Sequence, residues 1–341
     1  MARRPIILGI VGDSAAGKST LTQGVTKLLG PERVTHLCTD DYHKYDRVER
    51  ARLGITPLHP DCNYLDILEL HMERVHYGQA MLKPVYDHSN GTLVRPEYVV
   101  PREFVIVEGL LGFHTEVLRQ FCDVKVFLDP PEELRRVWKI KRDCTKRGYQ
   151  PEQVIAELEK RQNDTRNFIR PQREYADLVV RFCPPPEIPP EAAGPNLNVQ
   201  LVLRPTIPHP DLSYLFNGSQ SPDSGVHLEL NRDNGRPVDI LQIEGQVAAE
   251  HISQLEDAIW QHLPDLRPVR EDQFGDYLDR DQVRHSGPLA LTQLLLTYHL
   301  LRKYSDLSDI PFATPVAALS RLQTAPRGKA QKVARERSLS V

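Results

Sequence analysis

The residues best suited to chemistry lie near the start of the chain, in a loop that follows an apolar run. Nine of them match the phosphate-loop pattern G-x-x-x-x-G-K-S-T: Gly12, Asp13, Ser14, Ala15, Ala16, Gly17, Lys18, Ser19 and Thr20. A buried strand before such a loop and a helix after it allow the backbone N–H groups to surround phosphate oxygens. Lys18 would then reach the β- and γ-phosphates, and the Ser19 hydroxyl would bind Mg²⁺. We therefore predict a nucleoside triphosphate site here rather than a chance glycine turn.

Carboxylates follow two further apolar runs. Asp40 comes after residues 34–39, and Glu108 follows residues 104–107. Ligands of an open α/β sheet bind at the carboxyl ends of the strands, so both side chains should face the nucleotide. Asp40 could take a proton from an attacking hydroxyl or hold Mg²⁺, and an ordinary acidic turn is the alternative. Glu108 fits a second anchor for Mg²⁺ or for its waters.

Several cationic and aromatic side chains could recognise the acceptor substrate. His43 and Arg47 lie three and seven residues beyond Asp40, and they would face one pocket if this turn is helical. An arginine suits a phosphate because its planar fork binds oxygens in pairs. Tyr86 and His88 are expected on a loop, where a packed tyrosine and a surface histidine would explain them almost as well.

A dense group of charges follows on one predicted helix. Offsets of 3, 4 and 8 residues from Lys139 place Arg142, Asp143 and Arg147 on one helical face. Phosphoryl transfer needs mobile cations over the developing charge, so we favour a lid at 139–173 over a solvated, salt-bridged surface. Further arginines continue the basic character of this region: Arg161, Arg166, Arg170 and Arg173.

A layered α/β fold must position these side chains. Residues 1–182 alternate apolar strands with helices, the pattern of a parallel sheet covered on both faces. The expected strands are 6–11, 34–39, 104–107, 124–128 and 178–182. The expected helices are 18–29, 64–77, 114–121, 131–147 and 151–161, and a glycine at position 148 would end the fourth of them.

The second half of the chain has a different pattern. The proline-rich stretch 183–198 predicts a linker. Residues 199–320 predict a smaller α+β domain, with antiparallel strands at 199–204, 226–230 and 239–243 and helices at 248–263 and 288–304. Residues 321–341 predict a basic, disordered tail.

Composition narrows the classes of function. The net charge of −3 gives no reason to expect a nucleic-acid partner, and no run of 18 apolar residues could span a membrane. The five cysteines have neither the spacing of a disulfide framework nor that of a zinc site. They fit a reducing environment, and the short segment before the first strand leaves no room for a signal peptide. We therefore expect a cytoplasmic protein.

Taken in order, these motifs resemble the phosphoribulokinase/uridine kinase family of P-loop kinases. The shared motifs are the phosphate loop, D-D-Y-H at 40–43, K-P-V-Y-D-H at 83–88, V-E-G-L at 107–110, R-D-x-x-x-R-G at 142–148 and Y-A-D at 175–177. The H-x-x-x-R of His43 and Arg47 resembles the sugar-phosphate site of one branch, and uridine kinases need no such site. Segments 214–216, 240–246 and 286–293 resemble the plant and cyanobacterial members of that branch.

The resemblance implies a P-loop kinase fold, with a mostly parallel sheet, helices on both faces and a smaller α+β C-terminal region that extends the sheet. It implies the phosphorylation of ribulose 5-phosphate to ribulose 1,5-bisphosphate for carbon fixation in the Calvin cycle, with ATP and Mg²⁺, by a homodimer. Asp40 would be the general base, acting with Lys18 and Arg142. The implied metal contacts are Ser19, Glu108 and Asp143, with an orienting role as the alternative for Asp143. Lys139, Arg142 and Arg147 would serve the sugar phosphate and the transferred phosphoryl group. The full set of expected substrate-binding residues is His43, Arg47, Tyr86, His88, Lys139, Arg142, Arg147 and Arg173.

Two other functions stay open at this point. A uridine or cytidine kinase would share the lid motif, but Arg47 and the long C-terminal region argue against it. A nucleotide-sensing or scaffold protein would keep the loop without turnover, and the intact set of Asp40, Glu108 and Arg142 argues against that.

The cysteines depart from the pattern of the redox-regulated plant and cyanobacterial relatives. Those enzymes pair a cysteine in the phosphate loop with one just before D-D-Y-H. Here Cys38 matches the second position, but Ala16 stands at the first, and no cysteine follows Cys183. We therefore expect no switch disulfide, and an enzyme that is constitutively active or regulated by metabolites.

Overall fold

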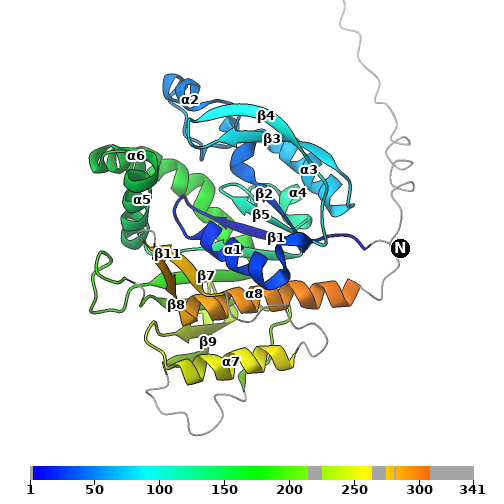
Figure 1. Cartoon of the computed structure of the whole chain (residues 1–341), viewed down its shortest axis with the longest axis vertical. Coiled ribbons are helices and arrows are strands. Elements are labelled where there is room, and N and C mark those ends of the chain that lie inside the picture. Colours follow the sequence, from blue (N-terminus) through cyan, green and yellow to red (C-terminus); the bar gives the residue numbers. More distant parts are fainter. Residues whose placement is uncertain (1–2, 195, 214–224, 263–273, 280–281, 308–341) are drawn as a thin grey trace, which may run out of the picture.

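The computed structural model describes residues 3–194, 196–213, 225–262, 274–279 and 282–307. Its centre is one eight-stranded sheet in the order β2-β5-β1-β6-β7-β8-β10-β9 (Figure 1). Five strands run parallel: β2 (Val34–Cys38), β5 (Phe104–Gly109), β1 (Ile6–Gly12), β6 (Val124–Leu128) and β7 (Leu178–Cys183). Three more extend the sheet by antiparallel pairing: β8 (Asn198–Leu203), β10 (Arg236–Ile243) and β9 (Val226–Asp233). The expected fold class is confirmed.

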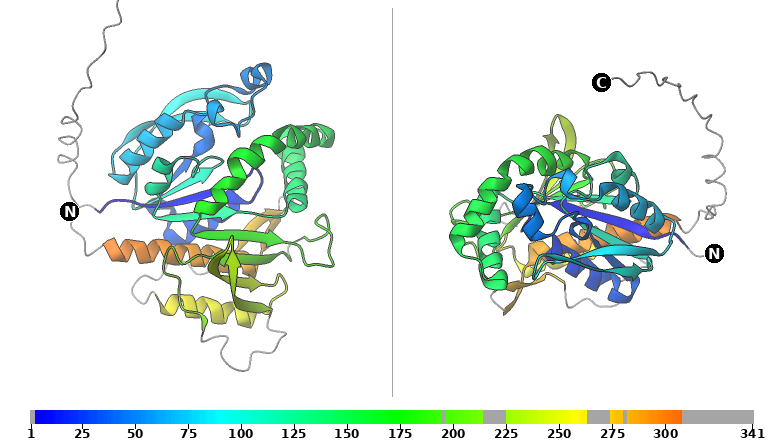
Figure 2. Two further views of the ribbon diagram at one scale, coloured as in Figure 1. Left: turned by 180° about the vertical axis from the view of Figure 1, so that it is seen from behind. Right: turned by 90° about the horizontal axis from the view of Figure 1, so that it is seen from above.

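Helices cover both faces of this sheet, as strand β1 shows. Every residue of β1 is buried, and its side chains alternate between two cores. Ile6, Leu8 and Ile10 belong to one core with α1 (Lys18–Leu29), α8 (Gly287–Asp306) and α7 (Ala249–Gln261), in which α7 packs on α8. Ile7 and Val11 pack with α3 (Leu65–His76) and α4 (Glu116–Gln120) on the other face. Figures 1 and 2 show α8 lying alongside α1 beneath the sheet.

The predicted lid is built from two helices at one end of the molecule. Helix α5 (Glu132–Arg147) is followed by α6 (Pro151–Asp164), and the two pack together (Figure 1). Gly148 ends α5 with φ of 69°, and its N–H donates to the carbonyl of Asp143. A left-handed backbone of this kind favours glycine, so the predicted cap is confirmed.

One local expectation was wrong, and one condition set for His43 and Arg47 is not met. Tyr86 was expected on a loop, but it lies in strand β3 (Met81–Asp87), which pairs with β4 (Thr92–Val99) in a separate two-stranded sheet. The segment from Asp40 onward is not one helix. A 3₁₀ turn covers Thr39–Tyr42, and α2 (Arg47–Leu53) starts anew with Asp46 as its N-cap.

The proline-rich segment lies between β7 and β8, which are hydrogen-bonded neighbours in the same sheet. Strands from both sides of this segment share one core. The division into domains at 183–198 stays a prediction. A short hairpin, β11 (Asp276–Asp279) with β12 (Gln282–His285), precedes α8. Segment 214–216 and the basic tail lie outside the described residues. No helix in the described part of the chain is both long and apolar enough to cross a bilayer.

Candidate functional site

The phosphate loop connects β1 to α1, as its sequence predicts. Gly17 caps α1 with φ of 99°, a conformation that favours glycine. The ammonium of Lys18 lies inside the loop, where it donates to the carbonyl oxygens of Gly12 at 2.8 Å and Asp13 at 2.9 Å. The positive charge of Lys18 is thus held where the phosphates of a nucleotide would lie.

Asp13 fastens this loop to the region of the lid. Its carboxylate is buried and accepts hydrogen bonds from the backbone N–H of Ser14 at 2.6 Å and from the Thr165 hydroxyl at 2.8 Å. Arg135 of α5 lies 3.4 Å from the same carboxylate and donates to the carbonyl of Ser14. Arg142, about two turns further along α5, donates to the Ser14 hydroxyl at 3.2 Å. The lid helix therefore contacts the loop through two arginines.

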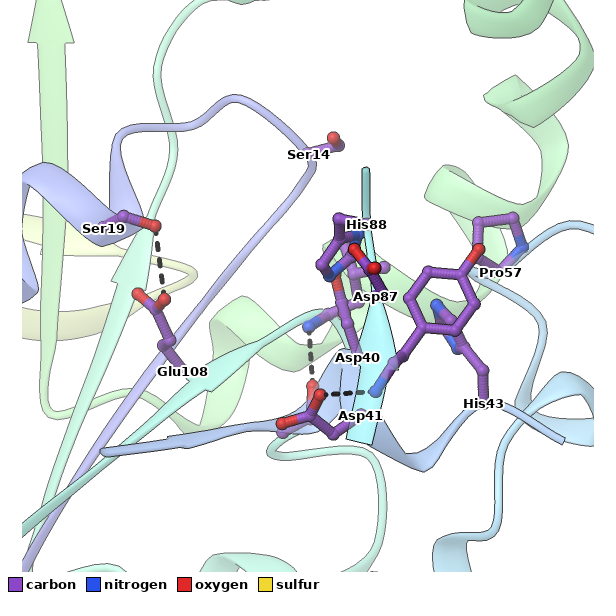
Figure 3. A network of polar contacts seen from close by, with 12 residues as sticks. Ser14, Ser19, Asp40, Asp41, His43, Pro57, Asp87, His88 and Glu108 are labelled. Carbon is purple, nitrogen blue, oxygen red and sulfur yellow. Dashed lines mark hydrogen bonds and ion pairs between the residues drawn. The ribbon is translucent and has the colours of Figure 1, made fainter. Parts of the chain in front are cut away.

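Oxygen ligands meet beside α1, at the carboxyl end of β5. The Ser19 hydroxyl donates to one oxygen of Glu108 at 3.2 Å (Figure 3). The Thr22 hydroxyl donates to the other oxygen at 3.0 Å. A hydroxyl and a carboxylate are ligands that Mg²⁺ accepts, so this pair fits the expected metal. The structure brings Ser19 and Glu108 together, as predicted, and adds Thr22 to them.

Asp40 lies across from this pair, next to His88 (Figure 3). One of its oxygens is 3.9 Å from Nε2 of His88, and the other is buried with no hydrogen-bond partner in the described residues. Burial raises the pKa of Asp40, but electrostatic interactions with His43, Lys18, His88 and Arg161 lower it, and the net pKa lies below the usual value. The carboxylate is therefore ionised at neutral pH and has a free lone pair.

Three aromatic rings line the approach to Asp40. The ring of Tyr86 packs edge-on against His43 and His88, with ring centroids 5.0 Å apart in each case. Asn63 accepts a hydrogen bond from Nδ1 of His43 at 2.7 Å, because its amide nitrogen is directed at two backbone carbonyls. Nε2 of His43 is then the unprotonated ring nitrogen. Burial lowers the pKa of both histidines, so each is neutral near pH 7.

Arg47 reaches the same region from the start of α2. Its guanidinium donates to the carbonyl oxygen of His88 at 2.8 Å. His43 and Arg47 thus both contact the end of β3, through Tyr86 and the carbonyl of His88, although no continuous helix links them. Asp41, by contrast, is structural: it accepts from the Lys83 ammonium and from the backbone N–H of Tyr86 at 2.9 Å, which fastens β3 to the turn.

The predicted cluster on α5 forms around Asp143. Its carboxylate accepts from Lys139 at 2.8 Å and from Arg142 at 2.9 Å, and Arg147 lies 3.4 Å away. Burial and the nearby Arg161 lower the pKa of Lys139 to about 8. A carboxylate surrounded by three cations supports the orienting role of Asp143 more than a metal-binding role.

Arg173 has other partners than the rest of the predicted site. It donates to Asp129, just after β6, and to Asp233, at the end of β9. The structure therefore places it in an ion-pair network at the junction of the parallel and antiparallel strands. Its contact with a substrate stays a prediction.

Comparisons with known proteins place this site in a family. The sequence model of the phosphoribulokinase/uridine kinase family matches residues 7–189. The chain is 34% identical over 257 residues to the phosphoribulokinase of Synechocystis, an alignment that covers 71% of this chain and 77% of that protein. It is 30% identical over 274 residues to the chloroplastic phosphoribulokinase of Triticum aestivum, covering 71% and 68% of the two chains. The protein belongs to the phosphoribulokinase/uridine kinase family.

Members of this family differ in how much of the chain they match. A uridine kinase of Chloroflexus aggregans is 35% identical over 187 residues, which is 88% of that protein but only 52% of this chain. The solved structure of a phosphoribulokinase from Rhodobacter spheroides has the same fold, with a TM-score of 0.50, 22% identity and coverage of 70% of this chain and 90% of that one. The protein is thus a kinase of this family with a large region beyond the part shared with uridine kinases.

Several residues of this kinase site escaped the sequence analysis. Arg50 of α2 is buried and donates to the hydroxyl of Tyr86 at 2.6 Å, while Thr165 and Arg135 hold the phosphate loop. Arg161 acts electrostatically on Asp40 and Lys139, although only its general basic character was noted. No motif marks Arg50 or Thr165, because their roles arise from contacts between distant segments.

Proposed function

We propose that this kinase transfers the γ-phosphoryl group of ATP to ribulose 5-phosphate and forms ribulose 1,5-bisphosphate, the reaction of the Calvin cycle. The observation that carries the proposal is the extent of the similarity to proteins named phosphoribulokinase. It reaches 71% of this chain and 77% of the Synechocystis protein, whereas similarity to the Chloroflexus uridine kinase covers 52% of the chain.

The arrangement of the site supports a direct transfer. The phosphate loop and Lys18 would hold the triphosphate, and Asp40 would take the proton of the attacking sugar hydroxyl on its unpartnered oxygen. A new bond then forms between the sugar oxygen and the γ-phosphorus, the bond from that phosphorus to the β-phosphate oxygen breaks, and ADP leaves. Ser19 and Glu108 would hold Mg²⁺, which neutralises charge on the phosphates when it is bound.

The cations around the pocket would serve the two phosphate groups. His43 and Arg47 lie beyond Asp40, where they could bind the phosphate already on the sugar. Lys139, Arg142 and Arg147 would cover the group in transfer, and Asp143 would hold their side chains in place. A buried carboxylate suits this positioning role because it fixes three flexible cations at once. We also propose a homodimer, as the resemblance implies, and a cytoplasmic location, which the pattern of the cysteines favours.

A coupled ADP-release assay tests the substrate. The protein is offered ATP and Mg²⁺ with ribulose 5-phosphate, uridine, cytidine or pantothenate in turn. ADP release with ribulose 5-phosphate alone, with a bisphosphate product, is the expected result. Turnover of uridine or cytidine would favour the nucleoside kinase, and ATP binding without turnover of any acceptor would favour the sensing protein.

A further inference from the structure

Three side chains of different chemistry meet at the carboxyl end of β2. The sulfur of Cys38, a carboxylate oxygen of Asp40 and a ring nitrogen of His88 all lie within 4.8 Å of one another. The Asp40 and His88 atoms are 3.9 Å apart. Within the described part of the chain, this is the cluster of three such groups that is compact enough to hold one metal ion.

We propose that Cys38, Asp40 and His88 bind a thiophilic divalent cation of the Zn²⁺ type, and that its binding inhibits the kinase by occupying Asp40. The binding step depends only on the cluster. The inhibition rests on the proposed function, in which Asp40 is the general base.

The ligand set selects the class of metal. A thiolate, an imidazole and a carboxylate are the side chains that bind Zn²⁺, and three of them leave a fourth position for water. Tetrahedral coordination at usual Zn²⁺ distances would place these ligand atoms about 3.3–3.6 Å apart, so the cluster, whose atoms lie within 4.8 Å of one another, must contract. Mg²⁺ prefers oxygen ligands, which Ser19 and Glu108 supply on the other side of the pocket.

The surrounding charges also favour a cation beside Cys38. Burial and the carboxylates of Asp40, Asp41 and Glu108 raise the pKa of its thiol, so the sulfur loses its proton only when a metal binds, but the same three carboxylates attract a cation to this position. The unpartnered oxygen of Asp40 offers a further free lone pair. Nearby cations repel a metal ion and so limit its affinity for the cluster. Lys18 and Arg161 act on Asp40, and Arg142 and Arg147 act on His88. The thiol proton would pass to solvent as the sulfur–metal bond forms.

Binding of the metal would block catalysis without removing ATP or Mg²⁺. An Asp40 oxygen that is bonded to a metal has lost the basicity needed to take the hydroxyl proton. His88 would be fixed beside it. The phosphate loop and the pair of Ser19 and Glu108 contribute none of the three ligands.

Cobalt provides a direct readout of the site. Co²⁺ replaces Zn²⁺ in such sites, and a bond from thiolate to Co²⁺ gives a strong near-ultraviolet absorption band. We expect this band when Co²⁺ is added to the wild-type protein and to the Cys144→Ser control, and we expect its loss in Cys38→Ser. Cys144 is half-buried on the lid helix and lies outside the cluster. A band that persists in Cys38→Ser, or that is absent from the wild type, would overturn the proposal.

Inhibition is measured separately, with chelator-buffered free Zn²⁺, excess Mg²⁺ and the acceptor that the ADP assay identifies. We expect the free Zn²⁺ concentration for half-inhibition to rise at least about tenfold in Cys38→Ser, since even indirect partners of a metal change affinity by about 10–100-fold. EDTA should restore the activity of the wild type. Equal inhibition of Cys38→Ser and wild type would contradict the inhibitory role.

The two readouts separate failure of this proposal from failure of the proposed function. If the acceptor is not ribulose 5-phosphate, the cobalt band still decides whether the site exists. If Cys38→Ser does not fold, Cys38→Ala replaces it. In addition, the double variant Cys144→Ser/Cys183→Ser, which removes the two other half-buried thiols, must keep the band.

Discussion

The side chain of Gln293 in α8 lies directly against the backbone of Gly24 in α1. Its amide nitrogen donates to the carbonyl oxygen of Thr20 at 3.1 Å, and its amide oxygen accepts from the backbone N–H of Gly275 at 2.7 Å. Gln293 is fully buried. Thr20 closes the phosphate-loop motif, so the C-terminal helix is bonded to the helix that carries Lys18 and Ser19.

Replacing Gly24 by alanine should therefore destabilise the protein. A Cβ at this position would lie 1.9 Å from the amide carbon of Gln293, so either this buried side chain or one of the two helices must shift. Overpacking of this kind costs about 1–3 kcal/mol, although alanine alone favours a helix over glycine by about 1 kcal/mol. We expect Gly24→Ala to lower the free energy of unfolding in a denaturant titration.

The control for this prediction is the same change in a Gln293→Ala background. Removal of the glutamine opens the space beside Gly24, so the alanine should cost less there than in the wild type. A double-mutant cycle gives the coupling between the two positions. An equal cost in both backgrounds would show that the contact is not responsible.

The main sheet could be predicted from the sequence because its parallel strands are buried on both faces. Such strands are continuous apolar runs, and the proline-rich break marks where the pattern changes. The β3–β4 hairpin escaped prediction for the opposite reason. Most of β4 is exposed, and β3 carries Lys83 and Pro84, so neither strand shows apolar alternation.

The candidate site could be predicted only where a motif or a strand end marks it. Ser19 and Glu108 meet because the phosphate loop leads from the carboxyl end of β1 into α1, and Glu108 lies at the carboxyl end of the neighbouring strand β5. The bond from Thr165 to Asp13 joins residues 152 positions apart, and the bond from Arg50 to Tyr86 joins residues 36 apart. Such pairs depend on how α2, α6 and the hairpin pack, which residue spacing does not encode. The same holds for the meeting of Cys38 with His88.

Asp40→Asn should abolish turnover and leave ATP binding nearly intact. An amide cannot take the hydroxyl proton, and general-base catalysis contributes about 10²–10⁴-fold. Steady-state kinetics and a nucleotide-binding titration measure the two effects. Asp46→Asn is the matched control, because asparagine caps a helix as well as aspartate does and activity should not change. More than half of the wild-type activity in Asp40→Asn would refute the general-base role.

Arg47→Ala should raise KM for the sugar phosphate far more than KM for ATP. Loss of a charge-assisted hydrogen bond costs about 1.5–3 kcal/mol, or about ten- to a hundredfold in affinity. Arg52→Ala removes an exposed arginine from the same helix and should change neither constant. Equal effects of Arg47→Ala on both substrates would mean that Arg47 supports the fold or the nucleotide site, since it also bonds to the carbonyl of His88.

The pH dependence of activity should report the charge of Lys139. Burial and Arg161 lower its pKa to about 8, so its positive charge is lost as the pH rises through that value. We therefore expect kcat/KM for the sugar phosphate to fall above about pH 8. Lys139→Arg keeps the charge at higher pH, since arginine is always protonated, and should move this fall upward. The exposed Lys146→Arg should leave the profile unchanged. A fall at the same pH in Lys139→Arg would assign it to another group.

Oxidation should leave the activity unchanged, in contrast to the redox-regulated relatives that the sequence resembles. All five cysteines lie in the described part of the chain as free thiols, and the buried Ala16 stands where a phosphate-loop partner of Cys38 would be needed. A disulfide also requires Cα atoms about 4.4–6.8 Å apart. The test is to incubate the protein with oxidised dithiothreitol, measure turnover, and measure it again after reduction. A chelator in every sample excludes metal bound at Cys38. A severalfold loss on oxidation that returns on reduction would reveal a thiol switch that Ala16 does not prevent.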